Sequence, residues 1–429
     1  MSQSSGAIPS SADLQRYVTA ALDARRRGDA AEERRHLDAA LAIEPANPQL
    51  LNARGMCALA MNDAADARAR FQAATASDPD QPILWINLAT ACRSLNDDTG
   101  EEASLDHALA IGRLNLTAQI RLADLHQRLH RTIRAVQSWS NVVQMIAPMT
   151  DRSPALEDAL TRGRTYLAAQ TSALGETLSA TLGDAITAAG PDARRVTACL
   201  DNLLGRRRIY PNVCAGLHVP FLPADEFFDP RLFPWFGALE RQTDAIRAEA
   251  LSLVERGVPG IRPYVRQDAG VPPNQWSALD NNLDWSACFL WEYGVRDDAI
   301  CALCPQTAAA LAAIPQNDSP GKAPTAFFSI LRPHAHIPAH TGVTNSRTII
   351  HLPLVVPDDC RFRVGGETRR WQEGRAFGFD DTIEHEAWND SDASRIVLIF
   401  DVWNPHLTAQ EQAMLKEVFR ITGQGVDEA

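Results

Sequence analysis

The chain has 429 residues, of which 45 % are hydrophobic and 22 % are charged, as in a soluble globular protein with two or three domains. A formal net charge of −12 argues against a nucleic-acid partner, because phosphate binding needs a basic surface. No segment approaches the roughly 18 consecutive apolar residues that span a bilayer, and the first ten residues do not resemble a signal peptide. We therefore expect a cytoplasmic protein without a membrane span.

The first third of the chain repeats itself with a period of 34 residues, marked by a turn dipeptide, a small residue between expected helices, and an acidic residue before proline. The turn dipeptides are Gly28-Asp29, Asn62-Asp63 and Asn96-Asp97; the small residues are Ala40, Ala74 and Ala108; and Glu44-Pro45 recurs as Asp78-Pro79. This combination is typical of tetratricopeptide repeats. We predict a solenoid of helix pairs over residues 13–150, with a fourth, weaker unit over residues 116–149.

Stacked helix pairs bury their apolar faces against each other and leave a concave groove. Such grooves usually bind peptides, so we expect a peptide or protein partner. Repeats that only dimerise the protein or brace the next domain agree equally well with the pattern, and the oligomeric state stays open.

Residues 151–207 remain rich in alanine and leucine, which predicts capping or linker helices that close the solenoid. Ala189-Gly190-Pro191 predicts one break in them. The arginine run at residues 206–208 is interpreted as a solvated linker or a salt-bridge surface.

The composition changes after Pro211, where aromatic residues become frequent and seven of the nine tryptophans lie. A helix is expected to follow Phe233-Pro234 as far as Val254, and a capping box at residues 408–411 opens a final helix. Between them, short apolar runs bounded by Gly, Pro and Asp predict strands. The runs are residues 326–331, 347–356, 360–364, 375–379 and 395–403. We predict a double-sheet jelly roll over residues 208–429, and hence a multidomain α + β chain.

His340 and His385 are 45 residues apart in this region and suggest a metal site. Oxygenases usually hold Fe(II) by two histidines and a carboxylate, which leaves positions open for a co-substrate and O2. Each histidine stands just outside a strand-like run, and a barrel brings such strand ends together. The usual first motif is His-X-Asp or His-X-Glu, but Gly342 stands here in place of the carboxylate.

Three stretches resemble a known family: residues 338–345 (Pro-Ala-His-Thr-Gly-Val-Thr-Asn), 379–388 (Phe-Asp-Asp-Thr-Ile-Glu-His-Glu-Ala-Trp) and 395–405 (Arg-Ile-Val-Leu-Ile-Phe-Asp-Val-Trp-Asn-Pro). From about Pro220 to its C-terminus the chain resembles the aspartyl/asparaginyl β-hydroxylase family of Fe(II)- and 2-oxoglutarate-dependent oxygenases. The resemblance implies a double-stranded β-helix (jelly-roll, cupin-like) domain with flanking helices. The family does without the third carboxylate, which agrees with Gly342.

By this resemblance, His340 and His385 bind Fe(II), with water completing the coordination, and no separate catalytic residue is implied. Arg395 matches the arginine that binds the distal carboxylate of 2-oxoglutarate, a task suited to a planar guanidinium. The implied co-substrates are 2-oxoglutarate and O2.

Ser329 and His351 match further contacts to the co-substrate. Alternation along a strand places Arg347 and Ile349 on the same face as His351, which makes Arg347 a second candidate for binding the co-substrate. Trp285 falls near an aromatic residue that lines the family's cleft, and Ile349 is assigned to the same cleft.

The carboxylates around the second histidine are interpreted as hydrogen-bond partners that cap the turn and orient His385, or as alternative metal ligands. They are Asp380, Asp381, Glu384 and Glu386. His334 and His406 are expected to be packed or surface residues, and His336 to have a supporting role.

Three features depart from the family. Its better-known members carry a second basic residue where Ile349 stands, so a carboxylate contact is expected to differ. Its animal members have a membrane anchor that this chain lacks, and their substrate cannot simply be carried over. Cys301 is similar in position to one of their cysteines, but no cysteine stands at the expected second place. The eight scattered cysteines predict buried free thiols.

The sequence therefore favours a 2-oxoglutarate-dependent dioxygenase that hydroxylates an unactivated carbon, with the β-carbon of Asp or Asn in a peptide or protein as first candidate. One alternative keeps this chemistry on a free amino acid, a carrier-bound intermediate or a lipid acyl chain. The other is a non-catalytic scaffold.

Overall fold

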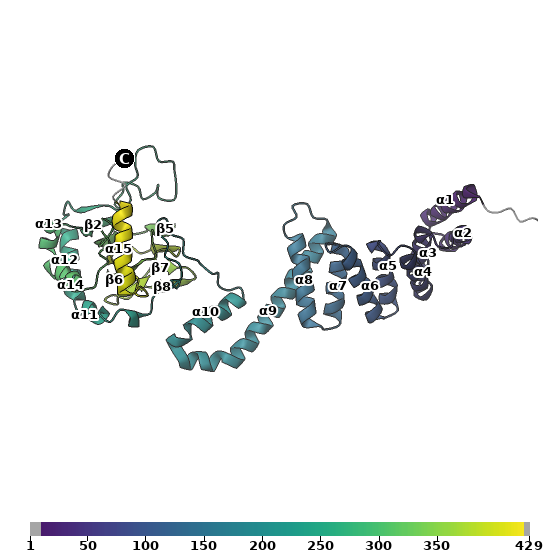
Figure 1. Ribbon diagram of the computed structural model, residues 1–429, viewed down its shortest axis with the longest axis horizontal. Helices are drawn as coiled ribbons and strands as arrows, with labels where there is room; N and C mark the ends of the chain where they lie inside the picture. Colours follow the sequence, from purple (N-terminus) through teal and green to yellow (C-terminus); the bar gives the residue numbers. More distant parts are fainter. Residues whose placement is uncertain (1–9, 424–429) are drawn as a thin grey trace, which may run out of the picture. The chain divides into compact units, whose positions relative to one another are not determined.

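The computed structural model describes residues 10–423, and the chain divides into two compact units between Ala193 and Arg194. Helices make up the first unit, and two antiparallel sheets with flanking helices make up the second (Figure 1). Among residues 10–423, no helix is both long and apolar enough to cross a membrane.

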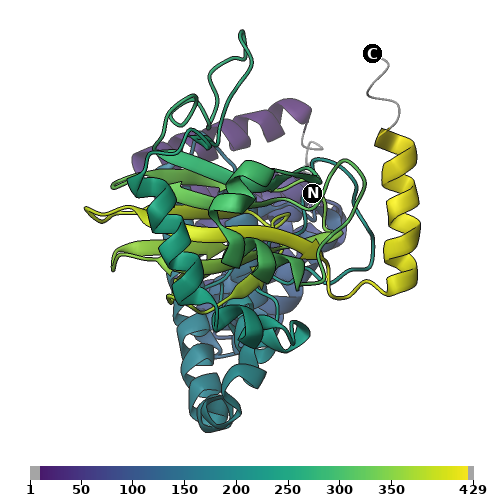
Figure 2. The ribbon, with the colours of Figure 1, turned by 90° about the vertical axis from the view of Figure 1, so that its left-hand side faces the viewer.

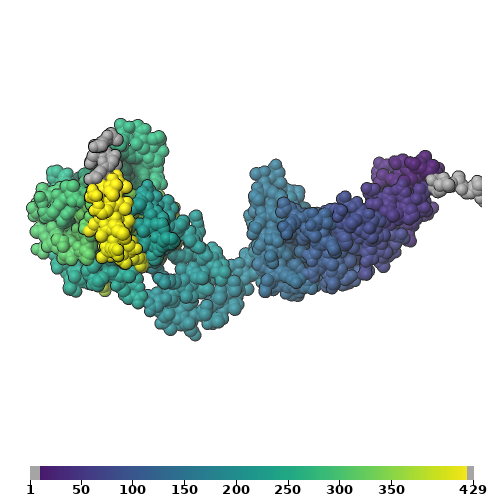
Figure 3. All heavy atoms as spheres, viewed as in Figure 1, coloured from purple at the N-terminus to yellow at the C-terminus, as the bar shows by residue number. Residues whose placement is uncertain are grey.

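The first unit is built from helix pairs with a period of 34 residues. The pairs are α1 (Ser11–Arg27) with α2 (Ala30–Ile43), α3 (Pro48–Ala60) with α4 (Ala64–Ser77), α5 (Pro82–Ser94) with α6 (Asp98–Ile111), and α7 (Leu116–Arg128) with α8 (Thr132–Ile146). Successive pairs pack on one another and form a continuous series in the space-filling view (Figure 3). This arrangement confirms the predicted tetratricopeptide repeats, the fourth unit included.

The turn inside each pair has the same backbone geometry, which explains the repeating dipeptide. Gly28, Asn62 and Asn96 have positive φ angles of 74°, 59° and 56°, a conformation that glycine and asparagine adopt most readily. The following aspartate then caps the second helix by accepting a hydrogen bond from the N–H three residues along. In the fourth pair His130 takes the left-handed position, with φ 52°, and no side-chain cap follows it.

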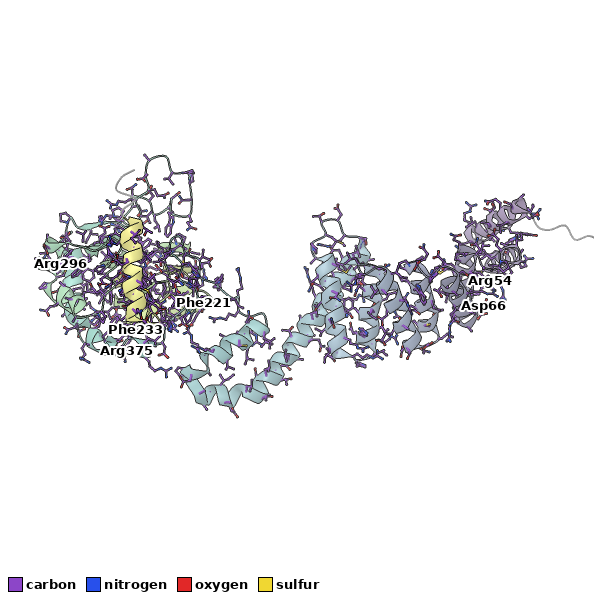
Figure 4. The ribbon with its side chains drawn as sticks, in the orientation of Figure 1. Arg54, Asp66, Phe221, Phe233, Arg296 and Arg375 are labelled. Carbon is purple, nitrogen blue, oxygen red and sulfur yellow. The ribbon has the colours of Figure 1, made fainter. Side chains whose placement is uncertain are left out.

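Small residues and one buried ion pair hold neighbouring helices together. A Cβ on Gly55 would lie 2.5 Å from the ring of Phe71, so the close approach of α3 and α4 needs glycine here. The guanidinium of buried Arg54 pairs with Asp38 of α2 at 2.8 Å and with Asp66 of α4 at 2.7 Å (Figure 4).

A single helix, α9 (Pro154–Ala189), follows the repeats. Its first turns pack on α8, where Ala159 and Leu160 are buried and a Cβ on Gly163 would meet Val143 at 2.9 Å. The helix ends at Gly190, as predicted, and a short 3-10 helix, η1 (Gly190–Ala193), precedes α10 (Arg194–Leu203).

The second unit contains two sheets whose strands all pair antiparallel. The larger sheet has the order β1 (Ile261–Pro263), β2 (Trp285–Glu292), β4 (Ala326–Leu331), β11 (Arg395–Trp403), β6 (Arg347–Val355) and β9 (Phe377–Phe379), and β3 (Val295–Arg296) pairs with β2. The smaller sheet has the order β5 (His336–His340), β10 (His385–Asn389), β7 (Cys360–Val364) and β8 (Glu367–Arg370).

The larger sheet has a different neighbour on each face. One face packs against helices that cover it in Figure 2, through a core that includes Ile246, Leu311, Leu398 and Phe400. These helices are α11 (Phe236–Glu240), α12 (Thr243–Glu255), α13 (Asp298–Leu303) and α14 (Pro305–Ala312). The other face shares a core with the smaller sheet that includes Trp285, Leu331 and Phe379 from the larger sheet and Ile337, Phe362 and Ala387 from the smaller one.

The remaining short elements are η2 (Pro230–Leu232) and the C-terminal helix α15 (Ala409–Gly423). Thr408 and Glu411 form the predicted capping box of α15. The helix predicted after Phe233-Pro234 is present as α11 and α12, with a break between Glu240 and Thr243.

Every strand predicted from an apolar run is present, and β4, β7 and β11 have the predicted bounds. Strands β1, β2, β3, β5, β8 and β10 were not predicted. For β5 and β10, the expectation that His340 and His385 stand outside strands is wrong. His340 ends β5 and His385 begins β10. Both strands carry polar residues with little apolar alternation, so they lack the signal that predicts a half-buried strand.

Candidate active site

The strand pairing brings the two histidines together. In the antiparallel pair of β5 and β10, His385 lies directly opposite His340. Their ring centroids are 4.0 Å apart, with an angle of 54° between the ring planes. Residues 45 positions apart in the sequence therefore share one site, as the sequence analysis expected.

Backbone carbonyl groups orient both imidazole rings. The Nδ1 atom of His340 lies 2.7 Å from the carbonyl oxygen of Pro338, and that of His385 lies 3.0 Å from the carbonyl oxygen of Ile383. Each Nδ1 therefore carries the proton and donates it, which leaves the lone pair on Nε2. Burial lowers the pKa of both rings, that of His385 well below its usual range, and keeps them in the neutral form that binds metals.

No third ligand completes the pair. Among residues 10–423, no group of three or more His, Cys, Asp or Glu side chains is arranged to hold a metal ion. A Cβ on Gly342 would overlap the carboxylate of Asp381, so a side chain at position 342 would require Asp381 to move away from its place beside Arg347.

The four carboxylates near His385 do not orient it, contrary to the sequence-based interpretation. Asp380 accepts hydrogen bonds from the backbone and hydroxyl groups of Thr382 and so caps the turn, as expected. Asp381 pairs with Arg347 at 2.8 Å, while Glu384 and Glu386 both pair with Arg363. The carbonyl group of Ile383 does the orienting instead, and no sequence pattern marks a backbone acceptor.

Arg395 is a buried cation without a carboxylate partner. Its guanidinium donates to the Ser329 hydroxyl at 2.9 Å and lies 4.5 Å from the ring centroid of Trp371. No carboxylate among the described residues is within ion-pair distance, and its Nε has no hydrogen-bond partner. Burial lowers the pKa of Arg395 to about 9. A buried cation of this kind is costly unless an anion binds to it.

His351 lies near this arginine and is surrounded by aromatic rings. Phe362, Phe377 and Phe379 surround it, with ring centroids 5.0–5.2 Å away. Burial and the charge of Arg395 hold its pKa well below the usual range, so the ring is neutral. The buried Nδ1 of His351 and Nε1 of Trp371 also lack partners. Two of the three unpartnered nitrogens here, Arg395 Nε and Trp371 Nε1, are obligate donors, and such donors suit an anion.

Arg347 also faces the site, but its charge is already balanced. Its guanidinium lies 2.8 Å from Asp381 and 3.5 Å from Asp401. Burial by itself would lower the pKa of Arg347, but these two carboxylates raise it above its ordinary value. Burial also raises the pKa of Asp401 to about 6 despite the neighbouring cation.

These side chains line one cavity of about 290 Å³ between the two sheets. It brings together seven of the eight predicted site residues: His340, His385, Arg395, His351, Arg347, Trp285 and Ile349. Ser329 is the eighth, and it contacts the site through Arg395 and the indole nitrogen of Trp285, which donates to it at 3.1 Å.

Several lining residues were not predicted as site residues. Phe327 alternates with Ser329 on β4, and Ile399 and Asp401 alternate with Arg395 on β11, so strand alternation could have found them. Tyr264 stacks on Trp285 at 3.9 Å and had no signal in the sequence. Trp276, expected to be core or cleft wall, meets His340 edge-on at 4.9 Å.

The other histidines lie outside the cavity. His334 is exposed beside Asp392, and His406 bonds Asp225 at 3.0 Å. His336 stacks on Trp388 at 5.1 Å and bonds Glu386 at 3.2 Å. Cys301 is a buried free thiol, as predicted, but the prediction of buried thiols is wrong for Cys199, which is exposed, and for Cys214, which is half-buried.

Comparison with known proteins gives a family match in this part of the chain. Residues 240–405, about two fifths of the chain, match the family model described as Aspartyl/Asparaginyl beta-hydroxylase. We call residues 194–429, which contain this match, the hydroxylase-family unit.

Relatives of two kinds are similar to this unit. The human aspartyl/asparaginyl beta-hydroxylase is 34 % identical over 182 residues, which cover 42 % of this chain and 22 % of the relative. The Rhizobium tropici ornithine lipid ester-linked acyl 2-hydroxylase is 36 % identical over 186 residues, covering 42 % of this chain and 60 % of the relative. The chain thus matches about a fifth of the first relative and three fifths of the second.

Solved structures with helical repeats are more distantly similar. The crystal structure of MamA aligns with a TM-score of 0.31 and 15 % identity, covering 36 % of this chain and 84 % of MamA. The first TPR of Spaghetti (RPAP3), bound to an HSP90 peptide, aligns with a TM-score of 0.28 and 17 % identity, covering 29 % of this chain and 99 % of that domain. The assignment of repeats rests on their own period and helix pairing.

Proposed function

We propose that the hydroxylase-family unit is an Fe(II)- and 2-oxoglutarate-dependent dioxygenase that hydroxylates an unactivated carbon. One juxtaposition carries the proposal: a neutral histidine pair with free Nε2 atoms lines the same cavity as a buried arginine without a carboxylate partner. The first suits a divalent metal and the second suits a bound carboxylate.

In this proposal His340 and His385 hold Fe(II) through Nε2. Their Nδ1 protons are fixed on backbone carbonyl groups, which sets the tautomer that metal binding requires. The two side chains occupy only part of a coordination sphere, and Gly342 adds no ligand. Positions therefore remain for the co-substrate, O2 and water.

Arg395 and Ser329 would hold the distal carboxylate of 2-oxoglutarate, and His351 would contribute a further polar contact. Binding of this carboxylate would supply the partner that the Arg395 guanidinium lacks. Arg347 is the second candidate anchor, although Asp381 and Asp401 already balance its charge.

When bound, Fe(II) and O2 supply the oxidant, and the protein contributes binding, orientation and the exclusion of water. The balanced reaction converts 2-oxoglutarate, O2 and a C–H bond into succinate, CO2 and a C–OH bond. One oxygen atom enters succinate and the other enters the product.

The arrangement of the sheets supports a double-stranded β-helix of the jelly-roll, cupin-like type, which we propose for residues 208–429. We keep residues 13–150 as the repeat solenoid and residues 151–207 as its capping and linker helices. The repeats are proposed to bind a peptide or protein partner, or part of the substrate.

The first candidate substrate is the β-carbon of Asp or Asn in a peptide or protein, in line with the family's name. A second candidate is a lipid acyl chain, a carrier-bound intermediate or a free amino acid, and the acyl-hydroxylase relative supports the lipid acyl chain among these. A non-catalytic scaffold is disfavoured, because the unit keeps both histidines and the unpaired Arg395 in one cavity.

The test measures Fe(II) binding and succinate formed from 2-oxoglutarate by the purified chain with Fe(II), ascorbate and O2. His385→Ala should abolish succinate formation and weaken Fe(II) binding, because one of the two side-chain ligands is lost. His406→Ala is the matched control, since His406 lies outside the cavity and should leave both unchanged. Full turnover by His385→Ala would refute the metal assignment.

A further inference from the structure

We infer that the part of the substrate that enters the cavity is an uncharged aliphatic chain and not an aspartate side chain. We further infer that Ile349 sets this preference. The inference rests on the proposed function and narrows its substrate class. It follows from where the charges of the cavity lie and from what surrounds them.

The cavity has no cation free to bind a substrate carboxylate. Among the described residues that line it, Arg347 and Arg395 are the permanent cations. Arg395 is buried against Ser329 and Trp371, at the end assigned to 2-oxoglutarate. Arg347 is the cation of the other end.

The Arg347 guanidinium is not free to bind a further anion. Its guanidinium is paired with Asp381 and Asp401, so these three residues together carry one net negative charge when both carboxylates are ionised. The buried atoms Asp381 Oδ1 and Asp401 Oδ2 also lack hydrogen-bond partners. A substrate carboxylate placed here would meet two like charges, which is unfavourable in a buried site.

Ile349 contributes an uncharged side chain to the cavity wall between two polar residues. It lies on β6 between Arg347 and His351, and all three side chains line the cavity. In the sheet it lies opposite Asp401 of β11 and Phe379 of β9. An isoleucine here brings no charge to this part of the cavity wall.

Further apolar residues surround Ile349. Ile349 packs with Phe327, Val397 and Ile399 on the face of the larger sheet that faces the smaller one. Tyr264 extends the wall and lies 5.3 Å from Phe327 between ring centroids. These side chains offer contacts to methylene groups and few hydrogen bonds.

A second cavity gives room for a longer chain. It has a volume of about 410 Å³ and shares Val343 and Arg347 with the first cavity. Leu217 from the segment before β1 and Val418 and Phe419 from α15 contribute apolar surface to its lining, which also includes polar residues such as Ser346 and the cation Lys322. An aliphatic chain can extend from the first cavity along these apolar residues.

The first experiment compares ligands that differ only in charge. Octanamide and octanoate are titrated into the full-length protein by calorimetry, without oxygen and with Fe(II) and saturating 2-oxoglutarate, so that Arg395 is occupied. We expect octanamide to bind at least about tenfold more tightly, because octanoate must bury a carboxylate near Asp381 and Asp401, where no cation among the described residues that line the first cavity is free to pair with it. Equal or tighter binding of octanoate would overturn the inference.

A series from butanamide to decanamide tests the apolar wall independently. Each added methylene should raise the affinity by about fourfold until the cavities are filled, since burying one methylene contributes about 0.8 kcal/mol. An affinity that does not change with chain length would also overturn the inference. These measurements use the unmodified protein and do not depend on the folding of any variant.

Substitutions at position 349 test whether Ile349 sets the preference for an uncharged ligand. Ile349→Arg should restore octanoate binding and reverse the preference by about tenfold or more, whereas Ile349→Leu keeps an apolar side chain and should retain the preference for octanamide. An unchanged preference in a folded Ile349→Arg protein would refute the role of Ile349.

Turnover separates this inference from the proposed function. Mass spectrometry should detect one added oxygen on octanamide, and a higher kcat/KM for a peptide with a central Asp or Asn would overturn the aliphatic assignment. Failure of the protein to bind 2-oxoglutarate would instead refute the proposed function, while the direct comparison of amide and carboxylate binding would still decide the charge preference.

Discussion

Each unit contains an arginine whose side chain is about 1 % exposed, Arg54 in the repeats and Arg395 in the hydroxylase-family unit. Arg54 pairs with two carboxylates from neighbouring helices, Asp38 and Asp66. Arg395 has a hydroxyl group and an aromatic ring beside it but no carboxylate. The same residue type thus connects helices in one unit and is left ready for an anion in the other.

The difference shows how a buried charge can indicate its role. A charge balanced within the fold contributes to holding the fold together, and its removal leaves its partners unbalanced. A charge that the fold leaves unbalanced lowers stability until a ligand binds. Arg347, which is balanced although it lines the cavity, belongs with Arg54 by this criterion.

The largest expected effect is on ligand binding at Arg395. Arg395→Met should weaken 2-oxoglutarate binding by about a hundredfold or more, because it removes charge-assisted hydrogen bonds to the carboxylate. Without ligand, the variant should be at least as stable as the original protein, since it no longer buries an uncompensated charge. Calorimetric titration and thermal unfolding with and without 2-oxoglutarate measure both effects. An unchanged affinity for 2-oxoglutarate would indicate that Arg347, and not Arg395, binds its carboxylate.

Removal of the buried arginine in the repeats should lower stability and leave ligand binding unchanged. Arg54→Met leaves Asp38 and Asp66 without their shared cation and should destabilise the repeats by about 3 kcal/mol. The affinity for 2-oxoglutarate should not change. Unfolding followed by helical circular dichroism tests the first expectation, and a repeat unit of unaltered stability would show that Arg54 is not a structural ion pair.

A smaller, pH-dependent effect is expected at Asp380, a buried carboxylate that is balanced by hydrogen bonds only. Burial raises its pKa to about 6, and the hydrogen bonds from Thr382 and Asn212 only partly offset this. The folded state then holds this proton more tightly than the unfolded state, so the contribution of Asp380 to stability increases as pH falls through 6 toward 4.

Asp380→Asn removes this titration. Between pH 7.5 and pH 4 the original protein should therefore gain on the order of 2 kcal/mol of unfolding free energy relative to the variant. Tryptophan fluorescence follows this unfolding, since seven of the nine tryptophans lie in the hydroxylase-family unit. A constant difference between the two proteins across this pH range would contradict the raised pKa.

Much of the first unit could be predicted because its determinants are local. Each turn needs a residue that tolerates a positive φ, followed by a helix cap, and both lie within a few residues of the helices they connect. The fourth repeat was the weakest because His130 and Arg131 fill these positions without the usual residue types. Similarly, β4, β7 and β11 were predicted from apolar runs within the strands themselves.

Other features depended on residues distant in sequence, and only the tertiary structure decided them. The histidines face each other because β5 and β10 pair in one register, although neither strand has a strong sequence pattern of its own. Asp381 lies 34 positions and Asp401 54 positions from Arg347, so no local pattern revealed that its charge is balanced. The sequence alone determined which residue types can bind a metal and a carboxylate. Folding decided which charges remain uncompensated, because electrostatic balance depends on distances in space.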